Sequence, residues 1–243
     1  MSYNNYLIIS ILMIITIYLL NNIPIALSIE ENDTELGYIC LSSKASTMAY
    51  IRNQESVIND LTNNTSLLGG YSVAVYNTTS DSDDSVFGHA LCRGDVTSDE
   101  CNTCVRNATD SDPCIGSRSG TVWRKYCMVK YSDVNFLETI DTNAFRWTDD
   151  IVWMDQSSVY VTKVLMDSVK RAAINNITMY ATGEAYVKDY GIVFTLQGMV
   201  QCTRDMSADY CKACLDRAID NLDTRKRGGG VVCGSCYAKF KTI

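Results

Sequence analysis

The residues of this sequence whose types and spacing could do chemistry are its cysteines, of which there are eleven. The spacing Cys, eight residues, Cys, two residues, Cys occurs twice, at Cys92, Cys101 and Cys104 and again at Cys202, Cys211 and Cys214. Cysteines at such spacings either bind zinc or pair as disulfides. Three Cys-X-X-Cys pairs would suit zinc, namely Cys101/Cys104, Cys211/Cys214 and Cys233/Cys236.

The start of the chain decides between these two chemistries. Leu7 to Leu20 is an apolar run, and Ala26-Leu27-Ser28 offers small residues for signal peptidase, so residues 1–28 are predicted to be a cleaved secretory signal. An uncleaved anchor is the alternative, since no Lys or Arg precedes the run, but the run is shorter than the ~20 residues that a membrane span needs. No later segment could span a membrane. Secretion favours disulfides over zinc, and the single histidine, His89, leaves little to complete a metal site. We expect neither a metal nor a cofactor.

Other residues that could catalyse a reaction have simpler explanations. His89 stands alone in a predicted strand, and we expect it to be structural rather than a general base. The pairs Asp95/Asp99 and Asp205/Asp209 could suggest glycosidase chemistry, but each flanks a predicted helix start, where capping explains it. The cluster Arg225-Lys226-Arg227 could meet an anionic sugar or phosphate, although a solvated turn is the simpler account. We therefore predict that the protein is not an enzyme.

The cysteine motifs belong to an internal repeat. Residues 91–110 align without a gap on 201–220, and Tyr126–Tyr131 matches Ser235–Phe240 with a one-residue slip. This predicts two homologous domains of ordinary size, at 29–135 and 156–243, joined by 136–155. The joining segment carries four large aromatic residues, Phe136, Phe145, Trp147 and Trp153, so we expect the two domains to pack together.

Periodicity places the motifs on secondary structure. We expect residues 29–39 to be an exposed lead-in. Helices are predicted at 46–61, 98–108, 161–174 and 207–222, and strands at 71–76, 86–91, 121–131, 180–187, 190–200 and 231–240. The expected fold class is α+β, with an antiparallel sheet of about five strands in each domain and two helices packed on one face.

The doubled motif resembles the plant cysteine-rich repeat secretory proteins, whose unit is the ginkbilobin-homologous, or stress-antifungal, domain. Tyr180–Glu184, Val200–Asp205 and Lys226–Gly229 support the resemblance, which covers residues 36–243. Receptor-kinase relatives carry a transmembrane helix after their repeats, whereas this chain ends at Ile243, so it resembles the soluble, secreted branch.

Six cysteines in the first domain allow fifteen pairings, and spacing alone cannot choose among them. The family pattern implies Cys40–Cys114, Cys92–Cys101 and Cys104–Cys127, followed by Cys202–Cys211 and Cys214–Cys236 in the second domain. Cys233 is left without a partner. It is either a redox-sensitive or intermolecular thiol, or a buried odd cysteine.

The resemblance also implies a ligand site to examine. Ginkbilobin binds mannose through an Asn after the first cysteine, an Arg six residues before the sixth, and a Glu five after it. These positions fall on Leu41, Thr121 and Ser132 in the first domain, and the last two fall on Gly230 and Lys241 in the second. None of the required polar groups is retained, so inherited mannose binding is not expected.

Charge and glycosylation signals complete the expectation of an extracellular (apoplastic) binding protein in plant stress or defence. A net charge of -7 argues against nucleic acid and anionic membranes as partners. Six acceptor sequons suggest a glycoprotein, at Asn32, Asn63, Asn64, Asn77, Asn107 and Asn176.

The expected role is a protein-interaction module that binds receptor ectodomains through the aromatic connection or an exposed strand edge. The alternative is a lectin-like antifungal protein that binds cell-wall glycans at a site different from the ginkbilobin mannose site.

Overall fold

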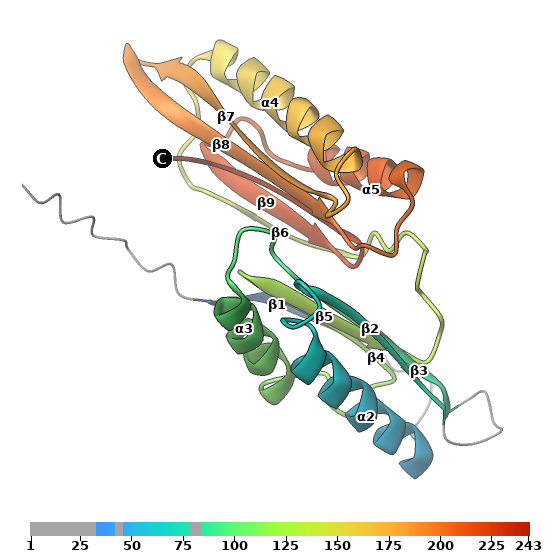
Figure 1. The fold of residues 1–243 in the computed structure, drawn as a ribbon. Coiled ribbons are helices and arrows are strands. Elements are labelled where there is room, and N and C mark those ends of the chain that lie inside the picture. Colours follow the sequence, from blue (N-terminus) through green and yellow to red (C-terminus); the bar gives the residue numbers. More distant parts are fainter. Residues whose placement is uncertain (1–32, 42–45, 78–83) are drawn as a thin grey trace, which may run out of the picture. The chain divides into compact units, whose positions relative to one another are not determined.

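The computed structural model describes residues 33–41, 46–77 and 84–243 (Figure 1). The predicted signal peptide and the sequon at Asn32 lie outside the described residues. Asp33–Ile243 form one unit, which contains both repeats.

Each repeat forms one five-stranded antiparallel sheet, as predicted. The first sheet has the order β1-β4-β5-β3-β2 and consists of β1 (Glu35–Leu41), β2 (Tyr71–Tyr76), β3 (Val86–Cys92), β4 (Ser119–Arg124) and β5 (Cys127–Ser132). The second has the equivalent order β6-β9-β10-β8-β7 and consists of β6 (Ala144–Thr148), β7 (Tyr180–Asp189), β8 (Ile192–Cys202), β9 (Gly228–Cys233) and β10 (Cys236–Thr242). The tandem α+β architecture is therefore confirmed.

Two helices cover one face of each sheet (Figure 1). They are α2 (Met48–Asn64) and α3 (Ser98–Asp110) in the first repeat, and α4 (Gln156–Ile174) and α5 (Ala208–Asp220) in the second. Thr47, Thr97, Asp155 and Ser207 cap their N-termini with side-chain oxygens. Helix α4 begins at Gln156 instead of the predicted residue 161 because Asp155 provides this cap.

The sequence prediction was wrong at several strand boundaries. Residues 35–39 are not an exposed lead-in but belong to β1, which pairs with β4. The predicted single strands at 121–131 and 231–240 are each two strands, folded back at tight turns between β4 and β5 and between β9 and β10. The turn between β7 and β8 lies at Tyr190-Gly191, two residues later than expected. Strand β6, within the connecting segment, was not anticipated; the domain limits at 135 and 156 stay a proposal.

The faces of the sheets that carry no helices pack against each other, so the helices lie on the outer sides (Figure 1). Each repeat has its own hydrophobic core between sheet and helices. A third cluster joins the two sheets and contains Leu91, Trp123 and Met128 of the first repeat with Val232 of the second. The expectation that the repeats pack together is confirmed.

Candidate functional site

The cysteine framework positions the rest of each repeat. Disulfides join Cys40–Cys114, Cys92–Cys101, Cys104–Cys127, Cys202–Cys211 and Cys214–Cys236. In both repeats one bond fastens the helix start to the end of the strand before it, and another ties the same helix to the last strand. Within the described ranges, only the first repeat has a third bond, which holds edge strand β1. These are the pairs that the resemblance implies, and their formation in the purified protein stays a prediction for peptide mapping.

Cys233 is a free thiol at the end of β9, where its residue is 4 % exposed. Its side chain faces the core of the second repeat, with Val231 and Cys236. The sulfur atoms of Cys214, Cys233 and Cys236 all lie within 4.8 Å of one another. Burial, reinforced by the charge of Asp141 and opposed by Arg146, raises the pKa of the Cys233 thiol to about 11.

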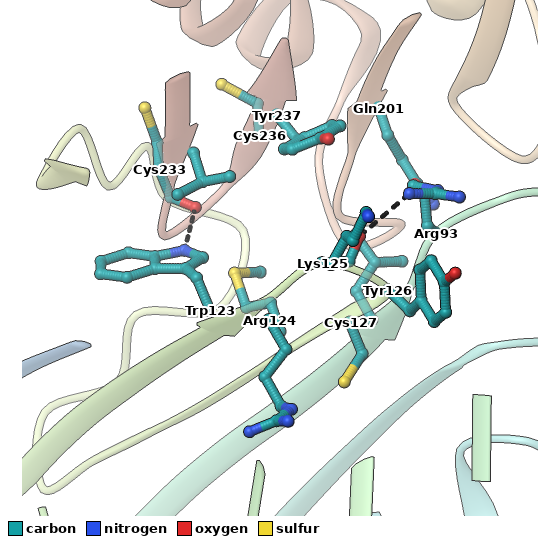
Figure 2. A pocket seen from close by; sticks show the side chains of 13 residues that line it. Arg93, Trp123, Arg124, Lys125, Tyr126, Cys127, Gln201, Cys233, Cys236 and Tyr237 are labelled. Atoms are coloured by element: carbon teal, nitrogen blue, oxygen red, sulfur yellow. Dashed lines mark hydrogen bonds between the residues drawn. The ribbon is translucent and has the colours of Figure 1, made fainter. Parts of the chain in front are cut away.

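A small cavity of about 40 Å³ lies where the two sheets meet (Figure 2). The Trp123 indole, on β4, donates a 3.0 Å hydrogen bond to the carbonyl oxygen of Cys233. The Arg93 guanidinium lies 4.8 Å from the Tyr126 ring centroid and donates to the Lys125 carbonyl at 3.1 Å. The cavity has room for about one water molecule, so we regard it as part of the interface rather than a ligand pocket.

Gln201 of β8 links the repeats across this interface. Its side-chain amide donates to the Cys92 carbonyl at 3.0 Å, and its Oε1 accepts from the Gly94 backbone N–H at 3.1 Å. A Cβ atom at Gly94 would lie 2.3 Å from the Tyr180 ring, so only glycine allows this close approach. Together with the Trp123 hydrogen bond, this means that each repeat has a side chain that hydrogen-bonds to the backbone of the other repeat.

His89 lies in the same interface and is 1 % exposed. Its ring makes edge contacts with Tyr71 and Phe136, and neither ring nitrogen has a hydrogen-bond partner in the described part of the chain. Burial lowers its pKa to about 4, the Asp205 and Asp141 carboxylates oppose the shift, and Lys130 adds to it. The ring is thus packed as part of the contact between the repeats.

The repeated carboxylates make different contacts in the two repeats. Asp99 lies in the first turn of α3, but the helix caps are Thr97 and Ser207, so capping does not explain Asp95 or Asp205. Asp95 pairs with Arg93 at 2.5 Å. Asp205 accepts from the Glu138 backbone at 2.8 Å; although burial works against its charged form, this and other hydrogen bonds hold its pKa below the usual range.

The basic cluster divides between surface and interior. Arg225 pairs with Asp223 on the surface, as expected of a solvated turn. Arg227, however, pairs with the buried Asp189 at 2.6 Å and lies over the Trp153 and Phe194 rings. For Arg227 the solvated-turn expectation was wrong, because its partner Asp189 lies 38 residues away in the chain, and the sequence around Arg227 does not reveal that the two are close in space.

The aromatic connection is used within the protein. Phe136 packs on His89 and on the Lys130 ammonium, Trp147 packs near Tyr237, and Trp153 is 5 % exposed. Trp147 packs against the cluster between the sheets, Trp153 belongs to the core of the second repeat, and Phe145 stays 37 % exposed.

The three positions equivalent to the ginkbilobin mannose site lie on neighbouring strands of the first sheet. Leu41 is exposed, whereas Thr121 and Ser132 are buried. Ser132 already accepts a hydrogen bond from the Val134 backbone at 3.1 Å. The loss of the mannose site stays a prediction, and this geometry supports it.

The described sequons differ in accessibility. Asn63, Asn64, Asn77 and Asn176 are exposed, while Asn107 is half-buried in α3, and its Nδ2 lies 3.5 Å from Asp33. We expect the exposed sites to be occupied before Asn107.

The β7–β8 hairpin carries the most exposed aromatic side chains of the second repeat, and the sequence analysis did not identify them. Tyr186 is 77 % and Tyr190 74 % exposed, and Ile192 and Val193, which follow the same turn, are 59 % and 63 % exposed. Tyr186 and Val193 occupy diagonal positions on one face of the hairpin. Tyr190 has φ 50° and precedes Gly191 at φ 80°, so a bulky residue holds a left-handed turn position. Asp189 fixes this turn by accepting the backbone N–H groups of Met154 and Asp155.

A groove of about 830 Å³ runs between α4 and α5 and the loop after α5. Its charged side chains balance in number: Asp167, Asp216, Asp220 and Asp223 against Arg146, Lys163, Lys170 and Arg225. Lys170 on α4 binds Asp216 on α5 at 2.6 Å. Thr224, which also lines the groove, is the counterpart of Cys114 at the repeat offset. The groove thus lies where the first repeat has its third disulfide.

No helix in the residues described is long and apolar enough to cross a membrane. Two of the solved structures that resemble this fold are tandem DUF26 ectodomains. The tandem DUF26 ectodomain of the Arabidopsis thaliana cysteine-rich receptor-like protein PDLP5 has a TM-score of 0.69 at 24 % identity, covering 86 % of this chain and 100 % of that one. The corresponding PDLP8 ectodomain has a TM-score of 0.68 at 19 % identity, covering 86 % and 98 %. At these identities the likeness concerns the fold alone.

Sequence comparison gives the family. An antimicrobial ginkbilobin-2-like protein of Castanea crenata is 36 % identical over 65 % of this chain and 67 % of its own length. Cysteine-rich repeat secretory protein 38 of Arabidopsis thaliana is 34 % identical over 67 % of each chain. The salt stress response/antifungal family matches residues 39–134 and 155–242. One of the two matched ranges falls on each repeat. The chain therefore belongs to the salt stress response/antifungal family, as a tandem of two such domains.

Proposed function

We propose that the protein is an extracellular interaction module of plant stress or defence, which binds another protein through the exposed end of the β7–β8 hairpin. The observation that carries this proposal is the group Tyr186, Tyr190, Ile192 and Val193, hereafter the hairpin patch. Exposed apolar groups of this kind mark protein contacts, and tyrosine is enriched in them. The proposal includes no catalytic step.

Three features support a binding role for the hairpin patch over chance exposure. Asp189 anchors the hairpin to the α4 start and to Arg227, so the side chains are presented on a fixed support. A tyrosine in the left-handed region at Tyr190 costs conformational energy, and such strain concentrates at functional positions. Strand β7 is also an edge strand, which could receive a partner's strand.

The test uses a panel of immobilised plant receptor ectodomains, including those with tandem repeats of this family. The double variant Tyr186→Ser/Val193→Ser should lose binding at least tenfold. Its matched control is Tyr160→Ser/Val164→Ser on α4, where Tyr160 is 70 % and Val164 48 % exposed. The control should bind as the wild type does. Equal binding by the hairpin variant would exclude the hairpin patch as the contact.

The groove between α4 and α5 favours a second function, the binding of cell-wall glycans. Its balanced charges, together with Gln156, Asn221 and Thr224, offer both donors and acceptors to a neutral polyhydroxylated ligand. The site would differ from the ginkbilobin mannose positions.

An array of plant and fungal wall polysaccharides, mannan included, tests this alternative. Binding that free sugar competes for, and that Asp220→Ala/Asn221→Ala abolishes, would establish the groove as a lectin site. The hairpin variant should retain such binding. A blank array would exclude the lectin function for these glycans and leave protein binding.

A further inference from the structure

The second repeat contains a sulfur cluster that its disulfide framework does not explain. Cys214 on α5 is bonded to Cys236 on β10, and the reduced Cys233 on β9 has its sulfur within 4.8 Å of both. We call Cys214, Cys233 and Cys236 the sulfur triad. The first repeat has Arg124 where the second has Cys233, three residues before the last disulfide cysteine, so the triad occurs only once among the described residues.

The strand geometry allows a bond between Cys233 and Cys236. They flank the two-residue turn Gly234-Ser235, and the antiparallel register that pairs Tyr237 with Val232 sets them directly opposite each other. Opposite residues of such a pair have their Cα atoms about 4.5–5.5 Å apart, which is within the range that disulfides span. Figure 2 shows the two side chains pointing to the same side of the hairpin, away from the cavity.

Burial confines the chemistry of the triad to its own members. Cys214 is 0 %, Cys236 2 % and Cys233 4 % exposed, so an external thiol cannot reach them in the folded protein. The only disulfide close to the Cys233 thiol in the described structure is Cys214–Cys236.

We propose that the sulfur triad is an intramolecular thiol–disulfide exchange site, in which the disulfide of the second repeat moves among Cys214, Cys233 and Cys236. In the first route the Cys233 thiolate attacks Sγ of Cys236. The Cys233–Cys236 bond forms, the Cys214–Cys236 bond breaks, and Cys214 leaves as a thiolate that takes up the proton lost by Cys233. Attack on Sγ of Cys214 instead releases Cys236. Each route conserves one thiol and one disulfide, so no oxidant or reductant is needed.

Exchange along the first route changes how α5 is held. The helix loses its covalent link to β10 and keeps the Cys202–Cys211 bond at its start. The thiolate is the reacting form, and burial and Asp141 disfavour it while Arg146 favours it. The rate should therefore rise about tenfold per pH unit through neutral and mildly alkaline pH.

The wild-type protein provides the first test. It is held in thiol-free, oxygen-free buffer at pH 7 and at pH 9, denatured in acid, and labelled with an excess of maleimide, and peptide mapping identifies the labelled cysteine. The proposal expects label on Cys214 or Cys236 besides Cys233, reached faster at pH 9. Label on Cys233 alone after long incubation at both values would overturn it.

Three variants provide a second, independent test. Cys214→Ser and Cys236→Ser each leave two members of the triad, which oxidised glutathione should join during refolding from denaturant, before burial, as it is reduced to two thiols, so no cysteine should then be alkylated. The matched control is Cys127→Ser, which leaves Cys104 and Cys233 in different repeats and should show two alkylated thiols. Two alkylated thiols in both folded triad variants would contradict the geometry. The wild-type experiment decides the question if a variant does not fold.

Discussion

His89 shows how a single buried side chain can make the contact between the repeats sensitive to acid. The ring packs between Tyr71 and Phe136, with Asp205, Asp141 and Lys130 as the charged groups nearby. In the folded protein its pKa is about 4, against an ordinary value of 6.5. The unfolded chain therefore binds a proton at a pH where the folded chain does not.

The sign of the effect follows from this difference. Because the folded pKa is depressed, the contribution of His89 to stability is complete above pH 6.5 and is lost as the pH falls towards 4. We expect the free energy of unfolding to drop by on the order of 3 kcal/mol over this window. Urea denaturation at a series of pH values measures it.

His89→Gln removes the titrating group and should flatten the slope between pH 6.5 and 4. Asp205, whose folded pKa is also lowered from 3.8, loses its contribution progressively from about pH 5 downwards, so its window lies mainly below that of His89. An unchanged slope in His89→Gln would show that other groups cause the dependence.

Strands β1 and β6 hold equivalent edge positions but are fastened differently. Cys40 ties β1 to Cys114 after α3, whereas the second repeat has no disulfide at β6. Edge strands open easily, and a covalent link limits that opening. The missing disulfide therefore leaves both a groove near α5 and a less constrained strand β6.

Hydrogen exchange should reveal this asymmetry, with the amides of β6 exchanging faster than those of β1. Cys40→Ala/Cys114→Ala should raise the exchange of β1 to the level of β6. Because the bond spans 74 residues, its removal should cost about 4 kcal/mol. Mass spectrometry of deuterium uptake and urea denaturation measure the two effects.

The control is Cys92→Ala/Cys101→Ala, which opens a loop of only 9 residues. It should cost about 3 kcal/mol and leave the exchange of β1 unchanged. Equal exchange of β1 and β6 in the wild type would refute the role of the third disulfide.

We expect the two repeats to unfold as one unit, because side chains of each repeat bind the backbone of the other. Trp123, Gln201 and Arg204 each hydrogen-bond to backbone atoms of the other repeat, around the cluster that includes Leu91 and Val232. Separation of the repeats would expose this buried apolar cluster to water, which opposes independent unfolding of either repeat. Calorimetry of the wild type should therefore show one transition.

Gln201→Ala tests this coupling. It leaves the Cys92 carbonyl and the Gly94 amide without their partner, so we expect a loss of about 2–4 kcal/mol and separate transitions for the two repeats. Gln197→Ala is the matched control, because Gln197 lies on the same face of β8 and bonds only to Glu184 on the surface. Similar melting of the two variants would mean that the interface does not couple the repeats.

The sequence by itself determined the features that depend on local spacing. The Cys-8-Cys-2-Cys motifs revealed the tandem, and local sequence patterns located all four helices and the strands β2 and β3, because such patterns lie within one element. The family followed from the same residues.

Only the tertiary structure decided what long-range pairing controls. Strands β1 and β6 were missed because each is an edge strand that pairs with a distant segment. The proximity of Cys233 to Cys214 depends on the packing of α5 over the β9–β10 hairpin. The exposure of the hairpin patch depends on the position of the turn at Tyr190-Gly191. The inward position of Arg227 required its partner Asp189, 38 residues away. Such contacts are set by strand register and packing between elements, which residue spacing does not encode.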